Sequence, residues 1–465
     1  MASHGRGAAA HATHHAIDEI KLSRTEVSRD LLDKVLKPRG AGLLIGSGLL
    51  FLVGLVGFAL RVTINGLDMD DRLHWGYYAA TLGFILTTFG AAPLVAFAFR
   101  MSKANWRRPL TRAAELWGIV SILILIMLIP LLMMLPSNQG RFSIWFDWPV
   151  GAPHVWLLVG FGMFMLSSLL WIWLPAIPDF AALREAAPGK GLYRRLALNW
   201  SGKPLQWAVH QDGLIMMGAF FFMNLIFAHF LYSVDFGIGL TPGWKDAIFP
   251  TYHALTALQG ALATTIITLY CLRRWGGLKE YIWVEQFWAL SKPLLSVSLL
   301  WFYFWWSGFI IFWYGKLPNE QAILRFLMFD VYRTPFVLTF LGCFVLPLLL
   351  LVWNPVRRSI LGPTVVSCII LVGLFFDKVR IYVASFSVPN EQLSHHVLDP
   401  LPAAHMPDAI DFMMIFGFIG GAVFFYGLAL RLLPAVSLWE IKEGITLRII
   451  KPFLRSAYAV IVKTR

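Results

Sequence analysis

The chain has 465 residues, of which 58% are apolar, 15% aromatic and only 14% charged. This composition excludes a large soluble domain, because few polar residues are left to cover one once the long apolar stretches are set aside. The formal net charge is +13. In a membrane protein such an excess comes from Lys and Arg kept on the cytoplasmic side, so we expect no nucleic-acid partner.

Residues 1–40 precede the first apolar stretch and are expected to form a cytoplasmic tail. Within it, residues 17–36 place Ile20, Val27, Leu31 and Val35 at helical spacing among charged residues. This pattern predicts a helix that lies on the membrane surface. The four His residues of the tail lack a second set of ligands, so they do not indicate a metal site.

Ten apolar stretches follow, each near or above the ~20 residues that a helix needs to cross a bilayer. They cover 41–60, 75–99, 113–135, 153–177, 214–234, 253–272, 287–314, 335–353, 359–383 and 410–430. The sequence therefore predicts an all-α integral membrane protein with one ten-helix domain over 41–434. Residues 435–465 are expected to form an amphipathic cytoplasmic segment, helical from Trp439 to Val462.

Glycines in the first and the tenth stretch indicate close helix packing, because small residues let backbones approach in a membrane. They are Gly46, Gly48, Gly54 and Gly57 in the first stretch and Gly417, Gly420 and Gly421 in the tenth.

The Lys and Arg residues predict the orientation. When the loops are assigned alternately to two sides, 29 of the 39 Lys and Arg fall on the side of the two termini and seven on the other. Both termini are therefore expected in the cytoplasm. The outside loops would be 61–74, 136–152, 235–252, 315–334 and 384–409.

Ionisable residues inside spans are costly and need a partner or a role. Lys292 lies in the seventh span, Glu285 lies two turns earlier on the same face, and Glu115 lies near the start of the third span. A structural ion pair and a proton relay that begins on the cytoplasmic side both fit these residues. We name Glu115, Glu285 and Lys292 as the candidate inner half of a proton path.

A second titratable group is expected near the outer ends of the spans. It consists of His154, His229, Asp235, His253, Asp377, Lys378 and Arg380. Histidines at this depth more often cap helices or lie at the headgroup level than bind a ligand. His229 and His253 could also clamp a haem. Asp377, Lys378 and Arg380 are the candidate outer half of the proton path.

The three cysteines, Cys271, Cys343 and Cys368, are isolated in the sequence. No pair has the spacing of a zinc or iron–sulfur site. We expect no metal and no cofactor held by this chain, so any redox chemistry would use a bound small molecule or the cofactors of partner subunits.

Five segments resemble NrfD/PsrC-type integral membrane subunits, and most of all those of alternative complex III. They are LPAIPDFAALRE (174–185), SVDFGIGLTPGWKDAIFPTYHALTALQG (233–260), ALSKPLL (289–295), FWYGKLPNEQ (312–321) and FFDKVRIYVAS (375–385). The resemblance covers roughly residues 30–435.

The resemblance implies ten helices arranged as two four-helix bundles plus two peripheral helices, in a bacterial cytoplasmic membrane. It also implies a menaquinol or other quinol pocket near the outer face, with electrons passed to an iron–sulfur subunit and to cytochromes c that carry haem. Further partners would be a paralogous NrfD-like subunit, small membrane subunits and lipids. We name His154, Asp235 and His253 as candidate quinone-binding residues, because a hydroquinone must pass its protons to acceptors within hydrogen-bond reach.

One motif departs from the family. The ActC-like subunits have a His after the third span and an Asp after P-x-V-W in the fourth. Here 130–142 read PLLMMLPSNQGRF, which has no His, and Leu157 occupies the Asp position. This departure favours the ActF-like paralogue. A secondary transporter with broken helices and a structural scaffold subunit stay open as alternatives.

Overall fold

The computed structural model describes residues 22–37, 40–67, 71–135, 152–393, 395–453 and 456–461. The helices of the main body are α2 (Ala41–Asn65), α3 (Gly76–Ile85), α4 (Pro93–Met101), α5 (Thr111–Glu115), α6 (Val120–Leu132), α8 (Ala152–Ala186), α10 (Pro204–Phe236), α11 (Phe249–Arg274), α12 (Val284–Gly315), α14 (Arg333–Phe340), α15 (Leu346–Leu351), α17 (Leu361–Lys378) and α19 (Ala409–Leu432).

Shorter elements lie at the two ends of the body. They are α1 (Arg24–Leu36), α9 (Gly191–Leu196), α13 (Pro318–Leu324), α16 (Asn354–Arg357), α18 (Ala384–Phe386), α20 (Leu438–Leu447), β1 (Arg448–Phe453) and β2 (Ser456–Ile461). Single turns of 3₁₀-helix are η1 (Arg72–Trp75), η3 (Asn105–Arg107), η4 (Leu116–Ile119), η5 (Ile238–Leu240) and η9 (Asn390–Gln392). Turns of π-helix are η2 (Leu86–Gly90), η6 (Arg325–Phe329), η7 (Leu341–Val345) and η8 (Val379–Val383).

Within the described residues, nine helical stretches are long and apolar enough to cross a membrane. They are Ala41–Asn65, Arg72–Met101, Thr111–Leu132, His154–Ala186, Pro204–Leu240, Phe249–Arg274, Val284–Gly315, Arg333–Leu351 and Ala409–Leu432. The chain is therefore a multi-pass membrane protein, as expected. The remaining predicted span, 359–383, forms α17 and η8, which do not belong to these nine.

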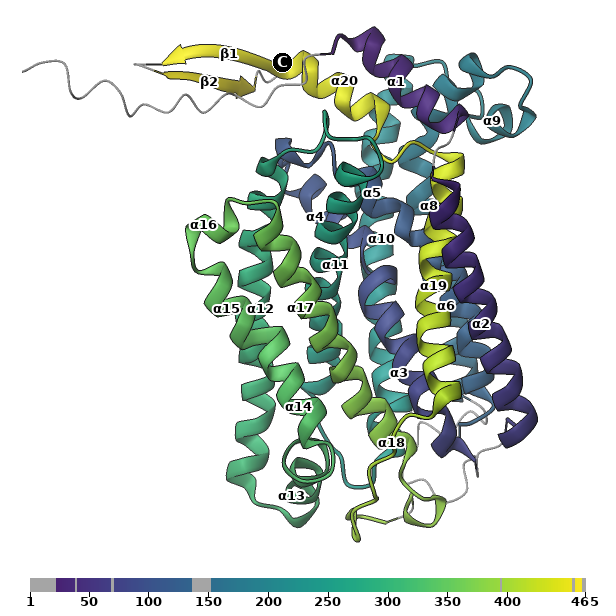
Figure 1. The fold of residues 1–465 in the computed structure, drawn as a ribbon, viewed down its shortest axis with the longest axis vertical. Helices are drawn as coiled ribbons and strands as arrows, with labels where there is room; N and C mark the ends of the chain where they lie inside the picture. Colours follow the sequence, from purple (N-terminus) through teal and green to yellow (C-terminus); the bar gives the residue numbers. More distant parts are fainter. Residues whose placement is uncertain are drawn as a thin grey trace, which may run out of the picture.

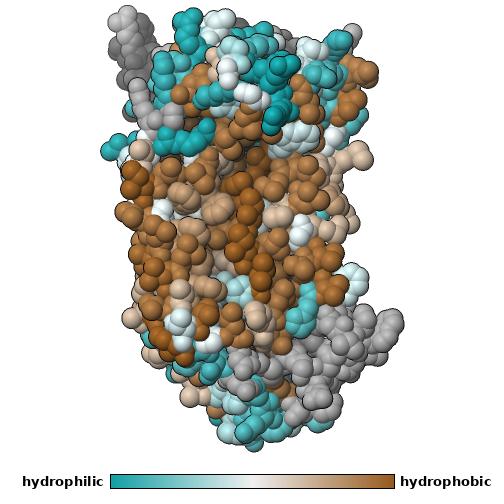
Figure 2. Space-filling model, turned by 90° about the vertical axis from the view of Figure 1, so that its right-hand side faces the viewer, coloured by the Kyte–Doolittle hydropathy of each residue, from teal (hydrophilic) through white to brown (hydrophobic). Residues whose placement is uncertain are grey.

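On the face shown in Figure 2, a broad apolar belt lies between two polar ends. On α2 the exposed side chains include Leu43, Ile45, Leu49, Leu52 and Val56. Exposed apolar side chains in such number suit lipid rather than water. The belt thus marks the part of the body that faces the membrane.

The body is elongated, and its helices run along its length (Figure 1). α2 packs on α19 at one side, α8 packs on α10, and α11 packs on α17 and α12 toward the other side. The elements α1, α9, α20, β1 and β2 gather at one end, and α13 and α18 lie at the opposite end. These are called the α20 end and the α13 end below.

The contact between α2 and α19 depends on glycine, as the sequence predicted. A Cβ added at Gly54 would lie 2.7 Å from the Cα of Gly417, so no other residue fits there without a shift of backbone. Gly420 and Gly421 face Leu50 and Phe51 of α2 in the same way. The two backbones therefore approach closely, which supplies dispersion contacts where lipid removes the hydrophobic driving force.

The N-terminal helix forms, but its apolar face has a different use from the one we expected. α1 begins after Ser23, whose side chain and Glu26 form a capping box. Val27, Leu31 and Val35 are buried inside the chain, and α1 packs on α20 and α19. Since these side chains meet protein, α1 is a cap on the α20 end and not a helix held by lipid alone.

The prediction of a C-terminal helix from Trp439 to Val462 is wrong beyond Leu447. The helix α20 ends at Leu447, and β1 and β2 then pair antiparallel, with Arg448 opposite Ile461. The sequence explains the change, because Pro452 cannot continue a helix. The surrounding RIIKPF and SAYAVI segments are also rich in β-branched and aromatic residues.

Candidate functional site

Three ionisable residues of the ninth predicted span are brought together inside the protein. Asp377 and Lys378 end α17, and Arg380 lies in the π-helix η8 that continues it. All three are 3% exposed or less. Turns of π-helix are rare and occur often at functional sites, so this segment is the first candidate for function.

The carboxylate of Asp377 accepts hydrogen bonds from three residues, Tyr252, Lys378 and Arg380. Its Oδ1 accepts from the Tyr252 hydroxyl (2.9 Å) and from Arg380 Nε (3.0 Å) and Nη2 (2.7 Å). Its Oδ2 lies 3.3 Å from Lys378 Nζ, which also donates to Thr256 Oγ1 (3.0 Å). Tyr252 and Thr256 lie one turn apart on α11, so α11 and the α17–η8 segment supply the whole cluster.

This Asp377 cluster, made of Tyr252, Thr256, Asp377, Lys378 and Arg380, has two cations and one carboxylate. With all three groups ionised it carries one net positive charge in a buried place. An uncompensated charge inside a protein is costly, and an electron-rich ligand oxygen at this place reduces that cost.

An aromatic cavity adjoins the Asp377 cluster at the α13 end. Its non-atom space is about 490 Å³ when the open solvent at its mouth is included, and about 50 Å³ of it can hold the centre of a water-sized sphere. Its apolar wall consists of Trp244, Ile248, Phe249, Phe304, Trp305, Gly308, Phe309, Phe312, Ile323, Leu324, Leu327 and Met328. Its polar wall consists of Asp246, Tyr252 and Arg380. A cavity with aromatic walls and a few convergent polar groups is typical of a site for a flat organic ligand.

Asp246 lies at the rim of this cavity, in the loop before α11. Its Oδ1 accepts the backbone N–H groups of Ile248 (2.8 Å) and Phe249 (3.1 Å), which fixes the carboxyl at the start of the helix. Burial raises the pKa of Asp246 above its usual range, against the opposing effect of these two hydrogen bonds. A carboxyl of raised pKa can accept and release a proton nearer to neutral pH.

A pair of histidines lies beside the same helices. His253 Nε2 is 2.7 Å from the Tyr382 hydroxyl, and His229 Nδ1 is 2.9 Å from the Leu225 carbonyl oxygen. The two imidazole rings contact each other, with centroids 5.2 Å apart. A haem clamped between them is therefore wrong, because its macrocycle would need the space that the rings already share.

The three predicted quinone-binding residues lie on three different helices, α8, α10 and α11. His253 is in the histidine pair, Asp235 is buried near the end of α10, and His154 is half-buried at the start of α8. In the part of the chain that the structure describes, none of them lines the aromatic cavity. Hydropathy placed them at a common depth, but depth does not fix the side of the helix to which a residue points.

The predicted proton-path residues fall into three separate places. Asp377, Lys378 and Arg380 form the cluster above. Glu115 is fully buried at the α20 end, while Glu285 and Lys292 are exposed on α12. Lys292 does not pair with Glu115 or Glu285, and its Nζ lies 3.8 Å from the ring centroid of Trp288 instead. The ion pair expected for Lys292 is therefore wrong for the described residues, while the inner proton path through Glu115, Glu285 and Lys292 stays a prediction.

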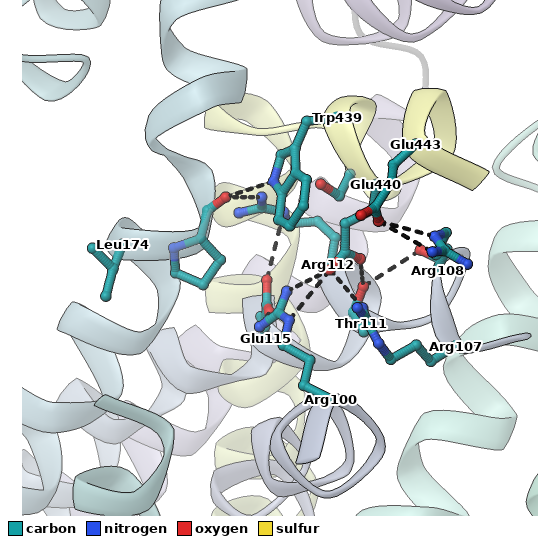
Figure 3. Close-up of polar contacts among 12 residues, drawn as sticks. Arg100, Arg107, Arg108, Thr111, Arg112, Glu115, Leu174, Trp439, Glu440 and Glu443 are labelled. Atoms are coloured by element: carbon teal, nitrogen blue, oxygen red, sulfur yellow. Dashed lines mark hydrogen bonds and ion pairs between the residues drawn. The ribbon is translucent and has the colours of Figure 1, made fainter. Parts of the chain in front are cut away.

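Glu115 belongs to a second buried network, drawn in Figure 3. It pairs with Arg100 and lies 3.6 Å from Arg112 Nε. Arg112 also donates to Asp179 of α8 (2.9 Å). These charges tie α4, α5 and α8 together at the α20 end.

Glu440 of α20 completes this network. It accepts from Arg100 (3.0 Å), Arg107 (2.6 Å) and the Thr111 hydroxyl, while Glu443 pairs with Arg108 (3.2 Å) (Figure 3). Burial alone would raise the pKa of Glu440, but Arg107 and Arg100 overcome this effect and lower its pKa to about 2. The Glu440 cluster, made of these residues with Arg112, Glu115 and Asp179, fastens α20 to the body.

Sequence reasoning missed Tyr252, Asp246 and Glu440. Tyr252 and Asp246 lie within the segment that resembles the NrfD family, but only the neighbouring His253 and Asp235 drew attention. Glu440 was passed over because the arginines of 100–112 were treated only as charges kept on one side of the membrane. A carboxylate in an apolar stretch close to an arginine-rich loop was the available signal.

The comparisons with known proteins add no relative: no model of a known family matches the sequence, and no curated protein matches it. In the described residues, no group of three or more His, Cys, Asp or Glu side chains could hold a metal ion.

Proposed function

We propose that this chain is a quinol-handling membrane subunit of an oxidoreductase of the alternative complex III type, in a bacterial cytoplasmic membrane with both termini cytoplasmic. One observation carries the proposal: the aromatic cavity ends on Tyr252, Arg380 and Asp246. A quinone ring is flat and apolar and has two opposite oxygens. It therefore suits a place where aromatic walls meet a small number of hydrogen-bonding groups.

The polar wall would serve oxidation as follows. Oxidation of a hydroquinone to the quinone releases two electrons and two protons. Arg380 and Tyr252 would bind one ring oxygen, and the net positive charge of the Asp377 cluster would favour an oxygen that is losing its proton. Asp246, which lines the cavity, would take the two protons one after the other and release each on the α13 side.

The electrons would leave the chain for partner subunits, since the family resemblance implies an iron–sulfur subunit and c-type cytochromes beyond the outer face. The cavity lies at the α13 end, which the Lys and Arg distribution predicts to be outside. Donor site and electron acceptor would then be on the same side of the membrane.

The finer architecture belongs to the same proposal. We count α17 with η8 as the tenth span, because it packs along α11 and α14 like its neighbours. Two four-helix bundles with α2 and α19 as the peripheral pair would complete an ActF-like or ActC-like subunit.

The substitution Gly308→Leu tests the quinol site. Gly308 lines the cavity, and a Cβ added there would have only Asp246 Oδ2 within 4 Å, at 3.6 Å. Leucine would fill the cavity, and its helix propensity is higher than that of glycine. We expect the complex to assemble with a KM for quinol raised about tenfold or a turnover lowered about tenfold, measured as quinol-dependent reduction of cytochrome c.

Gly162→Leu is the matched control. Gly162 is also a partly exposed helical glycine, on α8, and nothing lies within 4 Å of its added Cβ. Its quinol kinetics should match those of the unaltered complex. Unchanged kinetics in an assembled Gly308→Leu complex would reject this cavity as the site, and purification of the chain without redox subunits would reject the proposal as a whole.

A further inference from the structure

The exposed Lys292 on α12 is part of a cationic patch at the α20 end of the body. Its Nζ lies 3.8 Å from the centroid of the Trp288 ring, and the guanidinium carbon of Arg358 lies 4.9 Å from the same centroid. Two cations from different helical segments thus meet at one indole, whose π face attracts both. Arg358 directly follows α16, which packs on α12 at the left edge of Figure 1.

No carboxylate of the described residues balances the patch. Among the described residues, Lys292, Arg357 and Arg358 form no ion pair. Arg357 Nε is buried and has no hydrogen-bond partner among the described residues. Glu285, two turns closer to the start of α12, is exposed and does not reach Lys292. Since Lys292 and Arg358 both lie within 5 Å of one ring centroid, they are no more than about 9 Å apart. Like charges at this separation repel, and a bound anion would offset the repulsion.

The position of the patch along α12 matches the headgroup level of a membrane. Lys292 is eight residues beyond Val284, about 12 Å along the helix at 1.5 Å per residue. Trp353, at the start of α16, is 67% exposed, and exposed Trp is typical of the boundary between water and hydrocarbon. Below Lys292, the same face of α12 carries Leu299 and Tyr303, which are 45% and 61% exposed.

We propose that Lys292, Arg358 and Trp288 form a binding site for an anionic phospholipid. The phosphate lies between the two cations, as in basic sites between membrane helices that bind acidic headgroups, and the acyl chains lie along Leu299 and Tyr303. A zwitterionic lipid fits less well, because its own ammonium group competes for the phosphate and is repelled by the two cations.

Native mass spectrometry of the protein, purified with any subunits that accompany it, tests the site. Phosphatidylglycerol and phosphatidylcholine are titrated separately against the unaltered protein and the Lys292→Gln/Arg358→Gln variant. The unaltered protein should bind one phosphatidylglycerol more tightly than phosphatidylcholine, and the variant should bind that lipid about tenfold more weakly. Arg194→Gln/Arg195→Gln is the control, since it removes the same charge from exposed positions of α9 at the same end.

Three results would overturn the proposal. One is equal phosphatidylglycerol binding by the Lys292→Gln/Arg358→Gln variant and the unaltered protein, or an equal loss in the control. Another is release of the lipid by millimolar inorganic phosphate, which would make the patch a simple anion site. The third is carbodiimide cross-linking of Lys292 to a carboxylate of another subunit, which would make the patch a protein contact.

Discussion

The two buried ion clusters differ in charge balance and in what surrounds them. In the Glu440 cluster, four arginines face four carboxylates, and α20 covers them. In the Asp377 cluster, two cations face one carboxylate, and Tyr252 and Arg380 line a cavity. Balanced charges that are mostly buried hold segments together, whereas an excess charge beside empty space is suited to bind a ligand. The number of buried charges alone would not separate these two roles.

The largest expected loss of stability is in the Glu440 cluster, whose charges are balanced. Glu440→Gln leaves Arg100 and Arg107 without their shared carboxylate, and breaking a buried pair costs about 3–5 kcal/mol of unfolding free energy. Thermal unfolding in detergent measures the loss. Glu443→Gln is the control, because Glu443 is 36% exposed and, among the described residues, pairs with Arg108 alone. It should cost no more than about 1 kcal/mol. Equal losses would show that burial does not govern this cluster.

Removal of one cation should separate the clusters most sharply. Arg112→Met leaves Asp179 and Glu115 short of a partner and should destabilise the protein by about 3–5 kcal/mol. Lys378→Met leaves the balanced pair of Asp377 and Arg380, so unfolding free energy should change by less than about 1.5 kcal/mol. Quinol oxidation should still fall about tenfold, because the excess positive charge is gone. A large stability loss in Lys378→Met would contradict the contrast.

The contribution of Glu440 to the stability of the folded protein should be lost over a definite range of acidic pH. The folded-state pKa of Glu440 is about 2, below the ordinary value of 4.5. Its contribution to stability is therefore full above pH 4.5 and is lost as pH falls toward 2. The melting temperature of the unaltered protein should exceed that of Glu440→Gln by a constant amount around pH 6. This difference should shrink as the pH falls below 4.5. A difference that does not change with pH would mean that Glu440 is not ionised in the folded protein.

A smaller change in stability than in the Glu440 cluster is expected at the cavity. Tyr252→Phe keeps the ring but removes one hydrogen bond to the Asp377 carboxylate, which Arg380 still holds. We expect a loss of about 1.5 kcal/mol in unfolding free energy and a several-fold lower quinol turnover. Tyr332→Phe is the comparison, since Tyr332 is also buried but lies outside the cavity lining. Equal turnover in both variants would remove Tyr252 from the site.

Hydropathy located the membrane spans because length and apolar content are properties of a single segment. It could not assign partners. Tyr252 and His253 are neighbours at one depth, yet one faces Asp377 and the other Tyr382. Lys292 was expected to be buried, but near the end of a span its long side chain lies on the surface. Such outcomes depend on how each helix is rotated against its neighbours, and lipid-facing and protein-facing residues are alike in composition.

The π-helix η8 makes the length of its segment as important as its composition. A π turn amounts to one residue inserted into an α-helix. Loss of Val379 would return the segment to α-helix and bring Arg380 one position nearer to Asp377 in the chain, which moves its side chain by about 100° around the helix. The Arg380 side chain would then leave the side of the helix on which Asp377 and Tyr252 lie. Substitutions at Val379 should therefore be tolerated where a one-codon deletion is not, so that natural variation in this stretch is confined to changes of residue type.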